Sequence, residues 1–427
     1  MKFYRLSDKI FILLTVIFAF CFFKTAIADD KSAQIPTTAE IKSLPLTSSD
    51  IKPSVITNSY GKLNRNTLGC VIPLSGQYAD RGNKAKDAIL LATEIFDEKN
   101  FPLWKIIFED SQGLPEYTKT AIARLANAEN VIAIIAITGT AEAMDAAREA
   151  AKWKVPLILI TSKEGVTSLG EYVFQNFLTP RQQIRALAKY ALDDLNCAIF
   201  SILYPGDDYG EEMTKIFREE VMRLGGKVEK AISYNKDQTD FKEEIIKLTG
   251  ITVTASQKKR KVQEEDNTYI PVNFEALFIP DSYSRAKLIL AQLDFYDVKG
   301  FKLLGTSLWH SPNLLKNDAQ YLEGAIFVDS FFAHSSYLET SNFVDFYFKK
   351  FNREPENIEA LAYDTAAMVI GVLDDKKIKT RGQFAATLNK VENYKGATGK
   401  IYFDSSRVAQ KTPFIMRVTN GRLEQVK

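Results

Sequence analysis

Residues 131–162 read VIAIIAITGTAEAMDAAREAAKWKVPLILITS, and this stretch decides the fold. Val131–Ile137 is a continuous apolar run, Ala141–Lys152 is rich in alanine, and Val155–Ile160 is apolar again. Two apolar strands joined through a helix predict a parallel βαβ unit whose sheet is covered on both faces. Both strands are followed by small hydroxyl residues, at the sheet edge where open α/β sheets bind ligands.

The same alternation of strand and helix continues on both sides of this unit. Strands are predicted at 68–73 and 104–110, with helices at about 83–99 and 117–128. A second series begins with the strand 198–204 and resumes after a charged insertion at 251–273. At 427 residues the chain is long for one domain. The sequence therefore predicts an α/β protein with two doubly wound parallel-sheet lobes.

The amino terminus has the pattern of an export signal. Residues 1–28 combine a basic start, an apolar stretch and the small-residue cleavage pattern Ala26-Ile27-Ala28. Residues 29–67 are polar and aperiodic, which predicts a flexible linker. We therefore expect a periplasmic protein. Membrane tethering, through an uncleaved signal or a lipid on Cys21, is the less favoured alternative. The lipid is disfavoured because Phe20 is too bulky for the lipobox position just before the cysteine.

Composition and missing motifs exclude several classes of function. Lys and Arg number 55 against 53 Asp and Glu, which argues against nucleic-acid binding. The two histidines, His310 and His334, lack partners at metal-ligand spacing, and no phosphate-binding glycine loop or nucleophile elbow occurs. Cys70 and Cys197 lie in apolar strands, so we expect buried free thiols. We expect no metal, no cofactor and no enzymatic activity.

Polar and aromatic residues recur where the predicted strands end. In two lobes facing one another, such residues would enclose a small polar solute. The candidate ligand-binding residues are Ser75, Gln77, Tyr78, Arg81, Thr138, Gly139, Thr140, Ala141, Thr161, Ser162, Tyr209, Asp281, Tyr283 and Trp309.

Several motifs from Leu68 onward resemble those of leucine-binding-protein-like periplasmic solute-binding proteins. They include V-I-P-L-S-G at 71–76, F-E-A-L-F-I-P at 274–280 and G-A-T-G at 396–399. The resemblance implies two lobes joined by a hinge of three chain crossings, near 181–184, 322–331 and 394–399. It assigns residues 68–182 and 323–395 to lobe 1, and 183–322 and 396–427 to lobe 2.

The resemblance also implies roles for the candidate residues. It places Arg81 at the pocket mouth, residues 138–141 and 161–162 at the ligand head group, and Phe331 near the hinge. Tyr209, residues 281–283 and residues 307–309 would belong to the closing lobe. One departure concerns amino-acid binding: Glu142 stands in the first turn of a helix whose amino terminus would otherwise attract a ligand carboxylate.

A closer likeness favours a second hypothesis. The charged insertion, A-Q-L-D-F-Y-D-V-K-G at 291–300 and E-G-A-I-F-V-D-S-F-F at 323–332 resemble penicillin-binding-protein activators. The first hypothesis is capture of a small polar ligand, with an amino acid or amide as candidates, for an inner-membrane ABC permease. The second is regulation of a peptidoglycan synthase by protein contact. We favour the first.

Overall fold

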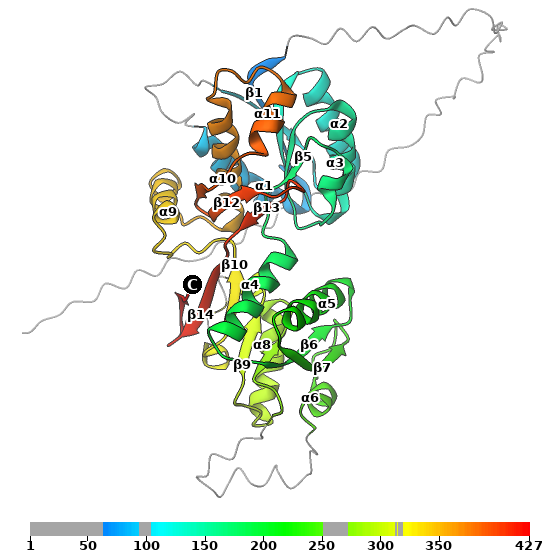
Figure 1. The fold of residues 1–427 in the computed structure, drawn as a ribbon, viewed down its shortest axis with the longest axis vertical. Helices are drawn as coiled ribbons and strands as arrows, with labels where there is room; N and C mark the ends of the chain where they lie inside the picture. Colours follow the sequence, from blue (N-terminus) through cyan, green and yellow to red (C-terminus); the bar gives the residue numbers. More distant parts are fainter. Residues whose placement is uncertain (1–62, 94–103, 251–271, 312–313, 315–318) are drawn as a thin grey trace, which may run out of the picture. The chain divides into compact units, whose positions relative to one another are not determined.

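The computed structural model describes residues 63–93, 104–250, 272–311, 314 and 319–427 (Figure 1). The predicted signal peptide (1–28), the linker up to residue 62 and the insertion up to residue 271 lie outside the described residues. Residues 64–67, predicted as linker, instead begin the first strand. Among the described helices, none has the length and apolar character that crossing a bilayer requires.

The first lobe is built on a five-stranded parallel sheet. Its strands are β1 (Asn64–Ile72), β2 (Lys105–Asp110), β3 (Val131–Ile137), β4 (Leu157–Ile160) and β5 (Val173–Gln175), in the order β2-β1-β3-β4-β5. All four pairings are parallel. The stretch 131–162 thus forms the βαβ unit that its pattern predicts, with α3 (Thr140–Trp153) between β3 and β4.

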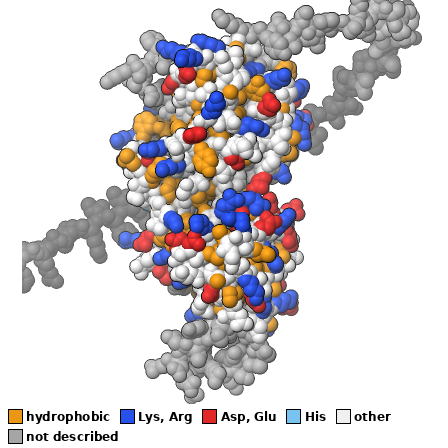
Figure 2. Space-filling model, in the orientation of Figure 1, with side chains coloured by type: hydrophobic (Ala, Val, Ile, Leu, Met, Phe, Trp, Pro, Cys, Tyr) orange, Lys and Arg blue, Asp and Glu red, His pale blue; other side chains and the backbone are white. Residues whose placement is uncertain are grey.

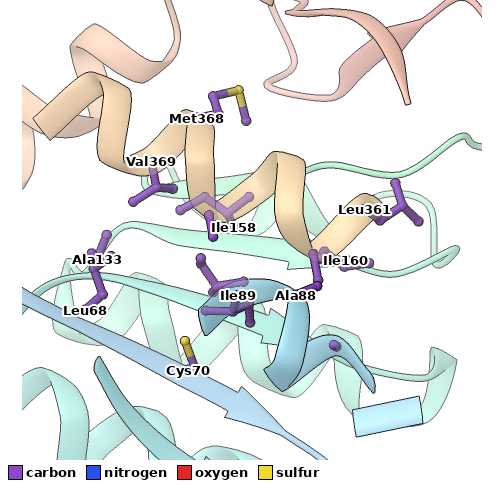
Figure 3. Close-up of a cluster of buried hydrophobic side chains, with 14 of the residues drawn as sticks. Leu68, Cys70, Ala88, Ile89, Ala133, Ile158, Ile160, Leu361, Met368 and Val369 are labelled. Atoms are coloured by element: carbon purple, nitrogen blue, oxygen red, sulfur yellow. The ribbon is translucent and has the colours of Figure 1, made fainter. Parts of the chain in front are cut away.

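Helices cover both faces of this sheet because alternate side chains of each strand point to opposite sides. In β1, Leu68, Cys70 and Ile72 enter one apolar cluster and Val71 enters another. The first cluster includes side chains of α1 (Ala79–Ala92) and α10 (Asn357–Leu373), as Figure 3 shows. The second includes side chains of α2 (Pro115–Asn127) and α3.

The second lobe repeats the strand order of the first and extends it. Strands β6 (Ile199–Pro205), β7 (Lys227–Tyr234), β8 (Ala276–Phe278), β9 (Lys302–Gly305) and β10 (Ile326–Asp329) follow the order β7-β6-β8-β9-β10. Beyond β10 lie β14 (Phe414–Thr419) and β15 (Arg422–Gln425), both paired antiparallel. This sheet is therefore mixed at one edge, whereas the sequence predicted parallel sheets.

Four helices flank the second sheet in the same way. Side chains of α4 (Pro180–Asp193) and α5 (Asp208–Arg223) join one apolar cluster. Side chains of α6 (Lys242–Thr249) and α8 (Tyr283–Phe295) join the cluster on the other face. The two described lobes are thus both three-layered α/β/α units.

The lobe boundaries differ from the expected ones at two places. Strand β10, expected in lobe 1, pairs with β9 and β14 in the second sheet. A third sheet, made of β11 (Tyr394–Gly396), β12 (Gly399–Phe403) and β13 (Ala409–Lys411), follows α9 (Leu338–Phe351), α10 and α11 (Arg381–Leu388). Ile401, Phe403 and Ala409 of this sheet pack in the core of the first lobe, not the second. The third crossing therefore lies between β13 and β14, because the inward side chains of β12 find their apolar partners in lobe 1.

Opposite charges are interspersed on the face of the molecule that Figure 2 shows. One ion-pair cluster joins α4 to α5: the buried carboxylate of Glu220 pairs with Arg181 (3.5 Å), Arg185 (3.3 Å) and Arg223 (2.7 Å). Burial opposes ionisation of Glu220, but Arg223 and Arg185 lower its pKa overall.

A glycine in each lobe lets the first helix approach the end of the first strand. A Cβ at Gly82 of α1 would lie 1.8 Å from the carbonyl oxygen of Pro73, just after β1. A Cβ at Gly210 of α5 would lie 2.0 Å from the carbonyl oxygen of Pro205, the last residue of β6. Both contacts are far shorter than van der Waals distance, so only glycine fits either position.

Replacing Gly82 should therefore destabilise the protein. We expect Gly82→Ala to lower the free energy of unfolding by about 1–3 kcal/mol or more, because the methyl group must push α1 off the strand. The matched control is Gly371→Ala in α10, where an added Cβ meets nothing within 4 Å and a gain of about 0.4–1 kcal/mol is expected. Urea denaturation measures both, and equal stabilities for the two variants would contradict the close approach.

A buried polar network ties α10 to the third sheet. Asp364 accepts hydrogen bonds from the backbone amides of Ala397 (2.7 Å) and Thr398 (2.8 Å) and from the Thr398 hydroxyl (2.5 Å). Lys411 donates to the Thr398 hydroxyl oxygen (2.7 Å). Both charged side chains are buried. Burial lowers the pKa of Lys411 to about 8, although the Asp364 carboxylate opposes this shift.

The lowered pKa predicts a stability that rises with pH. Between pH 8 and about 10.5 the unfolded chain still holds the Lys411 proton while the native protein has released it. The free energy of unfolding of the wild type, relative to Lys411→Met, should therefore increase over this window by at most about 1.4 kcal/mol per pH unit. Lys400→Met, at an exposed position of β12, is the control and should show no such difference. Parallel curves for wild type and Lys411→Met would contradict the shift.

Candidate functional site

A cleft of about 960 Å³ is walled by residues of both lobes. The first lobe contributes α1, the segment after β5 and the amino terminus of α10. The second lobe contributes the turn η3 (Ser307–Trp309) after β9, the end of β10 and strand β15. The charged, polar and aromatic side chains that line it include Asp80, Arg81, Lys84, Phe177, His310, Asp329, Ser330, Phe331, Phe332, His334, Glu354, Glu356, Asn357 and Arg422.

A polar cluster centred on Asp329 bridges the two lobes in this cleft. Asp329 lies at the carboxyl end of β10 and is buried. Its Oδ2 lies 2.7 Å from Nδ1 of His310, and its Oδ1 accepts from the backbone amide of Ser330 (2.6 Å) and from Nδ2 of Asn357. Asn357, at the start of α10, also donates to the Ser330 hydroxyl oxygen (2.8 Å). The first lobe is thereby hydrogen-bonded to the end of a second-lobe strand.

The other carboxylates of the cleft also have partners. Lys84 pairs with Asp80 (3.0 Å) and with Glu356 (2.9 Å), and these two contacts raise its pKa. Glu354 lies 4.0 Å from His334. Arg81 and Arg422, in contrast, make no hydrogen bond or ion pair with any residue that the structure describes. The unoccupied polar groups of the cleft are therefore mainly guanidinium donors.

The predicted head-group residues gather at the carboxyl ends of β3 and β4. The Thr161 hydroxyl donates to the Gly139 carbonyl (3.4 Å), and Gly139 is the N-cap residue of α3. Thr138 and Thr161 are buried, and the Thr138 hydroxyl has no hydrogen-bond partner in the described structure. Thr140, Ala141 and Ser162 are exposed. These residues come together as a group, but none of them lines the 960 Å³ cleft.

Glu142 caps the helix at this group. Its Oε1 accepts a hydrogen bond from the Gly139 backbone amide (2.8 Å), which is the half of a capping box that a glycine N-cap allows. The side chain is only 3% exposed. The amino terminus of α3 therefore already carries a carboxylate, the arrangement that the sequence predicted to disfavour a ligand carboxylate there.

The predicted residues of the second lobe lie in two environments. Tyr209 is 3.3 Å from the Thr306 hydroxyl, and burial raises the pKa of its phenol to about 12. Asp281 accepts a hydrogen bond from the Tyr234 hydroxyl (2.6 Å). Tyr283 and Trp309 instead belong to the apolar core of this lobe and do not line the cleft. Trp309 is so tightly packed that a Cβ at Gly305 would lie 2.2 Å from its ring.

Three further candidates follow β1. Ser75 donates to Asp110 Oδ2 (2.5 Å). Although burial opposes its ionisation, this hydrogen bond lowers the pKa of Asp110. Gln77 and Tyr78 are exposed. Of the residues selected from sequence, Arg81 and Phe331 line the cleft.

Sequence reasoning missed the Asp329 cluster. Asp329 is the last residue of β10 and Ser330 follows it, so in the structure they occupy the same kind of position as Thr138 after β3 and Thr161 after β4. His310 was considered only as a metal ligand. Asn357 gave no signal, since it reaches Asp329 through a contact between the lobes.

The described residues contain no group of three or more His, Cys, Asp or Glu side chains placed to hold a metal ion. Cys70 and Cys197 are buried free thiols, as predicted, and burial raises the pKa of each. The chemistry that the cleft offers is hydrogen bonding, charge and apolar contact.

Comparison with known proteins agrees with this architecture. A family model described as "Periplasmic binding protein" matches residues 66–256 and 274–422. No curated protein sequence matches the chain significantly.

Solved structures with the same fold cover nearly their whole length. A branched-chain amino acid ABC transporter protein from Rhodospirillum rubrum aligns with a TM-score of 0.73 at 18% identity, over 86% of this chain and 100% of the other. LivJ from Streptococcus pneumoniae, in complex with isoleucine, aligns at 0.61 and 21% identity, over 85% and 98%. A solute-binding protein from Rhodopseudomonas palustris, in complex with 3,4-dihydroxybenzoic acid, aligns at 0.63 and 20% identity, over 84% and 95%. With its two repeated α/β lobes and a family match over most of its length, the chain belongs to the periplasmic binding protein family.

Proposed function

We propose that this protein captures a small polar solute in the 960 Å³ cleft and delivers it to an inner-membrane ABC permease. The observation that carries the proposal is that the two lobes wall one cleft near the carboxyl edges of their sheets. Its volume is within the range of about 300–1,000 Å³ typical of small-molecule sites. The cleft is lined by apolar side chains and by charged groups of both signs, and the described part of the chain holds no metal-binding cluster, which supports a binding site.

The mechanism would be closure of the lobes on the solute. The lobes are linked by three chain crossings and by the Asn357–Asp329 contact, and a hinge of this kind concentrates the motion in a few backbone segments. A ligand that contacts both walls binds the closed state more tightly and so increases its population. The predicted signal peptide at 1–28 supports placing this activity in the periplasm.

The ligands named for structural neighbours support a solute that bears a carboxylate. The Streptococcus pneumoniae protein is in complex with isoleucine and the Rhodopseudomonas palustris protein with 3,4-dihydroxybenzoic acid. Amino acids, their amides and small aromatic acids are therefore the first solutes to test.

Ligand-induced stabilisation tests the proposal. The purified protein is unfolded, dialysed and refolded to remove bound solute, and its melting temperature is then measured with each compound. A true ligand at about 100 times its Kd should add roughly 2.7 kcal/mol to the free energy of unfolding. If no amino acid, amide or aromatic acid raises the melting temperature, the solute-capture function is contradicted.

Two hydroxyl deletions test the wider site. If the ligand reaches beyond the cleft to Thr161 and Tyr209, Thr161→Ala and Tyr209→Phe should each raise its Kd about threefold to tenfold, because each removes one hydrogen-bonding group. Neither residue lines the 960 Å³ cleft, so a ligand confined to the cleft should keep its Kd in both variants. The matched controls are Thr120→Ala and Tyr117→Phe, at exposed positions of α2, and both should leave the Kd unchanged. Calorimetric titration measures all four. Unchanged Kd values for Thr161→Ala and Tyr209→Phe would place these residues outside the binding site.

A further inference from the structure

We infer that the ligand carries a carboxylate that is held by Arg81 of α1 and Arg422 of β15, and not by the amino terminus of α3. The inference rests on the proposed function and names the ligand class and the residues that recognise it. Three features of the described structure carry it: the state of the charges in the cleft, the occupied end of α3, and the apolar wall beside the arginines.

The charges in the cleft leave only arginines available. Its four carboxylates, those of Asp80, Asp329, Glu354 and Glu356, all face a basic partner within 4.0 Å. The guanidinium groups of Arg81 and Arg422, in contrast, face no carboxylate partner among the described residues. A guanidinium has five N–H donors and binds a carboxylate through two parallel hydrogen bonds. An anionic ligand therefore meets donors that no other group has taken.

The two arginines come from different lobes. Arg81 is in the first turn of α1, directly before Gly82, whose contact with Pro73 fixes the position of this turn. Arg422 is the first residue of β15, at the edge of the second sheet. A carboxylate bound to both would link the lobes, so the same contact that selects the ligand also favours the closed state.

The end of α3 already carries a negative charge. Glu142 accepts the Gly139 amide hydrogen at 2.8 Å and is 3% exposed. A ligand carboxylate at the first turn of α3 would lie against this charge. The Arg81 guanidinium, in contrast, attracts a carboxylate.

Aromatic side chains in the cleft indicate that the rest of the ligand is apolar. Phe177, Phe331 and Phe332 line the cleft, and core packing fixes Phe331 and Phe332, which belong to apolar clusters of the first and second lobes. A carboxylate with an aliphatic or aromatic body meets both the guanidinium groups and these side chains.

Matched ligand pairs and charge-neutral variants test the inference. The probes are leucine, benzoate and 3,4-dihydroxybenzoate, with leucinamide and benzamide as neutral counterparts and glycerol 3-phosphate as a phosphate anion. Kd values are measured by calorimetry on the refolded full chain for wild type, Arg81→Gln, Arg81→Lys, Arg422→Gln and Glu142→Gln. Arg218→Gln is the control, because Arg218 is an exposed arginine of α5 outside the cleft.

At least one carboxylate should bind the wild type more tightly than its amide. Arg81→Gln should then raise its Kd about tenfold to hundredfold, Arg422→Gln should also raise it, and Arg81→Lys should fall between wild type and Arg81→Gln. Arg218→Gln should leave it unchanged. Melting temperatures without ligand, which should stay close to that of the wild type, separate lost binding from lost folding.

Four results would overturn the inference. One is an unchanged Kd in Arg81→Gln and Arg422→Gln. Another is a Kd that falls tenfold in Glu142→Gln while Arg81→Gln has no effect, since the carboxylate would then lie at α3. The others are tighter binding of the amides, and binding of glycerol 3-phosphate but of no carboxylate. In all four the protein still binds a solute, so the proposed function stands; a wild type that binds no solute at all contradicts that function first.

Discussion

The approach of a helix to the end of a strand, made possible by a glycine, is the constraint on which both lobes depend. Gly82 lies against the Pro73 carbonyl and Gly210 against the Pro205 carbonyl, each at a distance that no Cβ could tolerate. Since these contacts occur where the first strand of a lobe leads into its first helix, they fix the start of α1 and of α5. The residues directly before the two glycines are Arg81 and Tyr209. The same packing rule thus positions a candidate ligand-binding side chain in each lobe.

The connections between the lobes combine buried polar contacts with short crossings. Asp364 and Lys411 are joined through Thr398, which holds α10 to the third sheet directly before the chain crosses into β14. Asp329 ends β10 and accepts a hydrogen bond from Asn357 of α10. Buried polar groups of this kind contribute specificity of arrangement more than net stability, because their desolvation offsets much of their attraction.

Charged side chains distinguish the start of α3 from the cleft. In this chain Glu142 fills the amino terminus of α3, which is otherwise an anion-binding position. Arg81 and Arg422 offer their donors elsewhere along the cleft. The acidic side chain of Glu142 therefore disfavours an anion at the start of α3, whereas these two guanidinium groups, without a partner among the described residues, lie in the cleft.

The sequence by itself determined the α/β class, the βαβ unit at 131–162 and the division into two lobes, because these follow from local apolar runs and turn residues. It also selected Arg81 and Phe331, which line the cleft. The tertiary structure alone decided that β10 joins the second sheet, that β12 and β13 pack in the first lobe, and that Tyr283 and Trp309 are core residues. It alone brought His310, Asp329 and Asn357 together. The physical reason is that strand pairing and burial depend on partners far away in the chain, and an apolar run does not specify which of two sheets it completes.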